Sequence, residues 1–251
     1  GGWAIDTSVS DAGEVLVFAG GAALAGVPSP RATLRKPVPT SLDGLGSILE
    51  GQGIQLGDVT GDGTLDVVVA GENVDLQASN VGAILVVMGG AILTGTPSPL
   101  ALLALTNPSA DDKLGEGGLL LGDVTGDGVL DMVAVAPSAT LGVSNAGVLA
   151  VFEGGSGLGQ FGTPTALLRR AAPGADSLGE AGIPLLADLD QDGALDLLAP
   201  AAGLDGNASN SGAILFWRGG AGISGTVNPQ STLADPGASA NDLLGLQYFN
   251  L

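Results

Sequence analysis

Short apolar segments alternate with polar turns along the whole chain. The apolar segments run for four to eight residues, are rich in Val, Leu and Ile, and are separated by Gly, Pro, Asn and Asp. Such segments predict β-strands, because a helix would need a longer amphipathic period. In the stretch 109–173 we predict strands over Gly117–Leu121, Met132–Ala136, Gly147–Phe152 and Ala166–Arg170. The pattern therefore predicts an all-β protein.

An internal repeat organises these segments. The sequence DVTGDGTLD at 58–66 recurs as DVTGDGVLD at 123–131 and as DLDQDGALD at 188–196, at intervals of 65 residues. A second marker, Ser-Asn-x-Gly, begins at Ser79, Ser144 and Ser209, and each copy opens an apolar run that ends in Gly-Gly. Repeats of this length indicate that one structural unit is used several times.

Four short strands in a unit of about 65 residues are typical of a β-propeller blade. The chain is expected to be a single propeller domain or propeller segment over 1–251, with about four blade equivalents. The alternative is a β-solenoid with long rungs. The expected division is a partial blade at 1–43, blades at 44–108, 109–173 and 174–238, and a closing strand at 239–251.

The three acidic loops share the pattern D-x-[T/D]-x-D-G-x-x-D, which suits a hard divalent cation. Side-chain oxygens at positions 1, 3, 5 and 9 and the backbone carbonyl oxygen at position 7 can converge on one ion, at about 2.3–2.6 Å from it. The Gly at position 6 permits the sharp turn that this requires. This all-oxygen set favours Ca²⁺ over Mg²⁺ or a transition metal. The expected ligands are Asp58, Thr60, Asp62, the Thr64 carbonyl and Asp66; Asp123, Thr125, Asp127, the Val129 carbonyl and Asp131; and Asp188, Asp190, Asp192, the Ala194 carbonyl and Asp196.

The simpler interpretation is that each Asp-Gly pair only makes a turn. Three copies at a fixed period weigh against it, because several carboxylates packed into nine residues repel one another when no cation is present. The third loop has Asp190 where the others have Thr, so it is expected to bind calcium most tightly. The three calcium ions are expected to be structural, stabilising one blade against the next.

The amino-acid composition narrows the classes of function that this protein could have. The chain has 26 acidic and 7 basic residues, a net charge of -19, and neither His nor Cys. Disulfides, thiolate chemistry and most His-dependent catalysis are therefore excluded, and nucleic acid is an unfavourable partner. The longest apolar stretch, 81–93, is too short to span a membrane, so no membrane insertion is expected. We expect a non-catalytic protein; a carboxylate-based hydrolase or lyase is the less favoured alternative.

The units resemble the FG-GAP repeat family, the calcium-binding blades of the integrin α-subunit propeller. In the second unit Leu114-Gly115 occupies the place of the family's Phe-Gly, and Val135-Ala136-Pro137 that of its Gly-Ala-Pro. The expected calcium loop follows Gly122. The first unit departs from the pattern, with Ala70-Gly71-Glu72 in place of Ala-Pro. The resemblance implies a secreted or cell-surface protein that binds another protein or a glycan, or serves as a scaffold.

The two ends of the sequence are expected to be complementary parts of one blade. The chain opens with a strand-like segment at Trp3–Ile5 and finishes with another at 244–251. Three arrangements are compatible with this: a ring closed within one chain, a ring or filament formed by pairing between chains, and a fragment of a longer ring. Pairing between chains gives the alternative function, a self-assembling subunit of a surface layer or filament.

Overall fold

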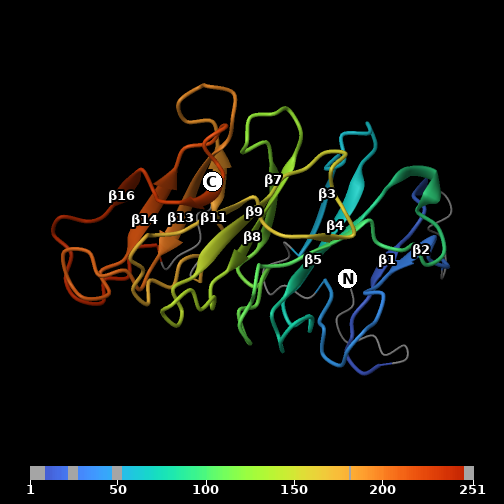
Figure 1. Ribbon diagram of the computed structural model, residues 1–251, viewed down its shortest axis with the longest axis horizontal. Helices are drawn as coiled ribbons and strands as arrows, with labels where there is room; N and C mark the ends of the chain where they lie inside the picture. Colours follow the sequence, from blue (N-terminus) through green and yellow to red (C-terminus); the bar gives the residue numbers. More distant parts are fainter. Residues whose placement is uncertain (1–8, 22–27, 47–52, 181, 246–251) are drawn as a thin grey trace.

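The computed structural model describes residues 9–21, 28–46, 53–180 and 182–245, and this part of the chain is all-β (Figure 1). A short 3₁₀ turn, η2, spans Gly90–Ile92. The strands are β1 (Val15–Val17), β2 (Ala32–Leu34), β3 (Ile54–Gly57), β4 (Asp66–Gly71), β5 (Ala83–Val87), β6 (Ala101–Leu103), β7 (Leu119–Gly122), β8 (Asp131–Ala136), β9 (Val148–Phe152), β10 (Phe161–Gly162), β11 (Ala166–Leu168), β12 (Leu185–Ala187), β13 (Asp196–Ala201), β14 (Ala213–Trp217), β15 (Gly225–Val227) and β16 (Ser231–Leu233). The four strands predicted in the second unit are confirmed as β7, β8, β9 and β11.

Each full unit forms one sheet whose four strands neighbour each other in chain order. The orders are β3-β4-β5-β6, β7-β8-β9-β11 and β12-β13-β14-β16, and all these pairs are antiparallel. A smaller sheet, β1-β2, comes from the first unit. Each 65-residue repeat of the sequence therefore corresponds to one sheet.

The sheets lie side by side in chain order, and the β1-β2 and β12-β13-β14-β16 sheets stand at opposite ends of the row (Figure 1). A separate hydrophobic cluster fills each of the three spaces between neighbouring sheets. Both faces of the two middle sheets are thus covered, which explains why β4, β5, β8 and β9 are continuous apolar runs buried at every position. None of the sheets closes on itself, and the described residues form an open row rather than a ring.

Two further strands extend the middle sheets and were not predicted. β10 pairs in parallel with β6 of the preceding unit, and β15 pairs in parallel with β11 of the preceding unit. An isolated bridge between Gly95 and Ala32 repeats this arrangement for the first unit. Each of these outer strands is therefore covered by a loop from the unit that follows, which protects its free hydrogen-bonding edge.

A repeated glycine brings successive sheets into contact. Gly82, Gly147 and Gly212 have φ values of 75, 72 and 74°. A Cβ atom at any of them would overlap the backbone of the Leu in the Leu-Gly pair of the next unit, namely Leu114, Leu178 or Leu244. The Ser-Asn-x-Gly marker thus records a place where two backbones approach too closely for a side chain. The predicted segment Trp3–Ile5 and residues 246–251 of the predicted closing strand lie outside the described residues.

Candidate metal centre

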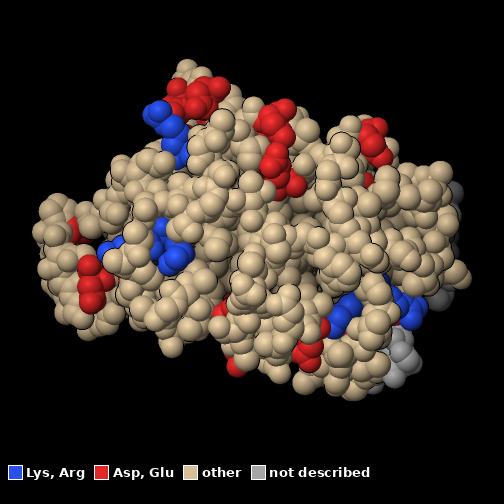
Figure 2. Space-filling view, viewed as in Figure 1, with Lys and Arg blue, Asp and Glu red and all other residues tan. Residues whose placement is uncertain are grey.

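The three acidic loops occupy equivalent places in their sheets. Each connects the first strand of a sheet to the second: β3 to β4, β7 to β8 and β12 to β13. All three lie along one edge of the row, where Figure 2 shows acidic side chains gathered at three separate places. The repeat in the sequence thus becomes a line of acidic loops on one side of the molecule.

The first aspartate of each loop organises the turn. The Asp58 carboxylate accepts hydrogen bonds from the backbone N–H groups of Gly61, Asp62 and Gly63 at 2.8, 3.0 and 2.8 Å. Asp123 repeats these bonds with 126–128 at 2.7, 3.1 and 2.8 Å, and Asp188 accepts from 192 and 193, both at 3.1 Å. The backbone therefore wraps around this carboxylate, as a compact oxygen cage requires.

Positions 5 and 7 of each loop are joined directly. The N–H of Thr64 donates to Asp62 at 2.7 Å, that of Val129 to Asp127 at 2.8 Å, and that of Ala194 to Asp192 at 3.0 Å. These bonds place each position-5 carboxylate beside the residue whose carbonyl was predicted as a ligand.

The last aspartate of each loop is buried and is held by backbone donors. Asp66, Asp131 and Asp196 are at most 1% exposed. Each accepts one N–H from the first residue of the Gly-Gly pair, which is Gly89, Gly154 or Gly219, at 2.9–3.1 Å. A Cβ atom on that glycine would strike the carbonyl group of the loop residue at position 8. The Gly-Gly marker is thus explained by its contact with the acidic loop.

Burial raises the pKa of the Asp131 carboxyl above its ordinary value, and N–H donors from Gly154 and Thr125 only partly oppose that rise. The Thr125 hydroxyl also lowers this pKa by its proximity, but it does not meet hydrogen-bond geometry. Burial of Asp131 therefore disfavours its ionised form. A bound cation would favour that form.

Position 3 supplies an independent indication of a ligand. The Oγ1 atoms of Thr60 and Thr125 are buried and have no hydrogen-bond partner among the described residues. Thr60 as a whole is only 9% exposed. A buried hydroxyl without a partner is destabilising, unless something binds it. Both hydroxyls stand at a predicted ligand position, so the residues present fit a calcium ion.

The third loop differs from the other two. One carboxylate oxygen from each of Asp188, Asp190 and Asp196 lies within 4.8 Å of the others, the closest approach of three acidic groups in the described part of the chain. Asp190 also forms an ion pair with Arg218, at 2.7 Å between Oδ2 and Nε. Its turn contains Gln191 at φ 62°, where the other loops have Gly61 and Gly126. The extra carboxylate is therefore accompanied by a competing positive charge, which the sequence pattern did not reveal.

The loops are bonded to the sheet that follows. The second residue of the Gly-Gly pair, Gly155 or Gly220, donates its N–H to the carbonyl of Val59 or Val124 in the preceding loop, at 2.7 and 2.8 Å. Leu195 donates to the Asp123 carbonyl at 2.8 Å. Backbone hydrogen bonds thereby join each of these loops to the next unit.

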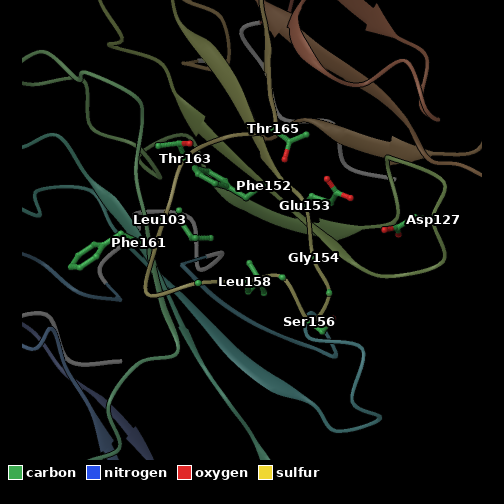
Figure 3. Close-up of a pocket in the computed structure, with 14 residues that line it drawn as sticks. Leu103, Asp127, Phe152, Glu153, Gly154, Ser156, Leu158, Phe161, Thr163 and Thr165 are labelled. Carbon is green, nitrogen blue, oxygen red and sulfur yellow. The ribbon is translucent and has the colours of Figure 1, made fainter.

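A pocket of about 570 Å³ lies beside the second loop (Figure 3). Asp127 and Glu153 line it together with the apolar side chains of Leu103, Phe152 and Phe161. A cation in the second loop would therefore sit next to this pocket through Asp127.

Comparison with known proteins adds no identification: no family model matches the chain, and no curated protein is significantly similar to it. Among the described residues, no helix is both long and apolar enough to cross a lipid bilayer.

Proposed function

We propose that this protein is a calcium-stabilised, non-catalytic β-propeller or propeller segment of the FG-GAP type. The observation that carries the calcium proposal is the buried Thr60 hydroxyl, which has no described partner and stands at a ligand position of a loop already wrapped around Asp58. A cation would satisfy this hydroxyl and neutralise the loop carboxylates together.

The propeller proposal is supported by the strand order. Each unit is a four-stranded antiparallel sheet in chain order, and the sheets pack face to face. A solenoid would instead pair the strands of successive rungs in parallel. The parallel pairs here, β10 with β6 and β15 with β11, involve only outer edges.

A structural role for calcium favours a location where calcium is plentiful. Extracellular modules bind Ca²⁺ with dissociation constants of about 10⁻⁴–10⁻³ M, which suits loops that are largely exposed to solvent. We therefore propose a secreted or cell-surface location and a role in adhesion, recognition or scaffolding, with a protein or a glycan as the partner.

Calorimetric titration of the chelator-treated chain with CaCl₂ tests this function. We expect three sites per chain, and the loss of one site in each of the variants Asp58→Asn, Asp123→Asn and Asp188→Asn. The matched control is Asp235→Asn, which changes an exposed turn aspartate outside the loops. Binding that is absent from the unchanged chain, or that survives all three loop substitutions combined, would refute the proposal.

A further inference from the structure

The outward face of the last sheet is apolar and, among the described residues, lacks the cover that its counterparts have. Strand pairing places Leu185 opposite Leu198, Leu198 opposite Phe216, and Ile214 opposite Leu233, so these five side chains share one face. We call this set the tail face. Leu233 is 52% exposed and the other four are partly exposed.

Four of these five positions are fully buried in the preceding units, whereas the counterparts of Leu185, which are Leu120 and Gln55, are partly exposed. One period earlier, Val133, Leu149, Val151 and Leu168 are each 0% exposed and pack against the last sheet. Another period earlier, Val68, Ile84, Val86 and Leu103 are at most 1% exposed and pack against the third sheet. The tail face therefore has the chemistry of an interior interface, but no described segment covers it.

The first sheet presents the complementary half. In each interior interface the tail-face positions pack against a second set, which in the third sheet includes Ala150 and Phe152. The corresponding residues of the first sheet are Leu16 and Phe18, which we call the head face. Leu16 is partly exposed and Phe18 is 40% exposed, whereas Phe152 is 2% exposed.

The outer edge of the last sheet is open as well. All three residues of β16 are exposed, and no described segment pairs along its free side. The corresponding strands β6 and β11 are each covered by a parallel segment of the next unit. An open sheet edge beside an open apolar face is a site for adding another sheet.

We propose that a second copy of this chain docks head to tail, with its head face against the tail face. One chain carries both halves of an interface that it already forms three times internally, and the two open halves stand at opposite ends of the row (Figure 1). The two faces cannot meet within one chain in this arrangement. Head-to-tail contacts generate a ring if the rotation closes and a filament if it does not. The inference rests on sheet packing and does not require the calcium proposal.

Sedimentation velocity over a concentration series in calcium-containing buffer tests the interface. We expect mass to rise with concentration up to about 100 µM, and Phe216→Lys to weaken association at least about tenfold. Leu16→Glu should do the same from the other side. Phe161→Lys is the control, because Phe161 is 76% exposed on β10 in the middle of the row.

Mixing the two face variants gives the sharpest result. The Phe216→Lys variant keeps an intact head face, and the Leu16→Glu variant keeps an intact tail face. A mixture is expected to form 1:1 dimers without larger species, which two identical faces meeting each other could not produce. Association that survives both substitutions would overturn the proposal.

Hydrogen exchange of the unchanged chain covers the case in which a variant fails to fold. We expect β1, β13, β14 and β16 to gain protection at high concentration, while β4 and β8 do not change. An unchanged chain that stays monomeric would overturn the proposal and leave the tail face for another part of a longer chain or for a different protein. Native mass spectra of the same samples count bound calcium, so failure of the interface and failure of the calcium sites are distinguishable.

Discussion

Arg218 reaches back from the end of β14 to the third acidic loop, where its Nε lies 2.7 Å from Oδ2 of Asp190. Asp190, the carboxylate that the other two loops lack, is thus paired with a side chain of its own sheet. A calcium ion that used Asp190 would compete with, or sit beside, the guanidinium. The tighter binding that we expect at this loop therefore depends on how easily Arg218 moves away. Its side chain is 59% exposed, which leaves it room to do so.

Removal of the Arg218 charge should strengthen calcium binding at the third loop. In a chain with Asp58→Asn and Asp123→Asn, so that only the third loop binds, Arg218→Ala should raise calcium affinity several-fold because a competing positive charge is removed. Calorimetry measures the change. Arg218→Lys is the control that retains the charge, and it should leave the affinity close to its starting value. An unchanged affinity in Arg218→Ala would show that Arg218 does not compete for Asp190.

Substitution of the unpartnered hydroxyl should have opposite effects with and without calcium. Thr60→Val keeps the shape of the side chain and removes a buried polar atom, so without calcium it should be neutral or stabilise the fold by about 1 kcal/mol. With calcium it removes a ligand, and affinity at the first loop should fall about tenfold. Thermal unfolding with and without chelator measures both effects. Thr226→Val, at an exposed position on β15, is the control. Equal effects under the two conditions would contradict a ligand role for Thr60.

The close backbone approach between sheets gives a prediction about stability. Gly147 has φ 72°, and a Cβ there would lie 2.5 Å from the Leu178 carbonyl oxygen. Gly142 has φ 93°, but a Cβ there would meet nothing within 4 Å. Gly142→Ala should cost about 1 kcal/mol for the left-handed backbone alone, whereas Gly147→Ala adds a steric cost of about 2 kcal/mol or more. Chemical denaturation measures both variants, and equal losses would argue against the sheet contact.

A pH effect is expected where the second and third sheets meet. Burial, and then repulsion from Glu116, raises the pKa of Glu72 above 4.5, while Lys113 acts in the opposite direction. A carboxyl whose pKa is raised by folding favours the folded state when protonated. Its contribution is present below pH 4.5 and is lost as the pH rises through the folded-state pKa.

Glu72→Gln should therefore stabilise the protein at pH 7 and have little effect below the unfolded-state pKa. The gain should stay under about 1 kcal/mol, because solvent screens a half-exposed site. Denaturation curves at several pH values measure it. A gain that is the same at pH 3 and pH 7 would contradict the electrostatic explanation.

The sequence predicted the parts of the structure that repeat with strong local signals. The strands of the second unit and the position of the acidic loops followed from apolar runs and from Asp-Gly spacing. β10 and β15 were missed because they are two and three residues long and exist only through pairing with another unit. The contact between Arg218 and Asp190 spans 28 positions, and no local pattern announces it. The Thr60 hydroxyl could be placed at a ligand position from spacing, but its lack of a partner is a fact of three-dimensional packing.

Native mass spectrometry of the unchanged chain in calcium-containing buffer, before and after chelation, tests the calcium proposal directly. We expect three calcium ions per chain, lost on chelation and regained when calcium is restored. A chain that carries no bound calcium at millimolar concentrations would contradict the calcium proposal and leave the acidic loops as turns held by their own backbone hydrogen bonds.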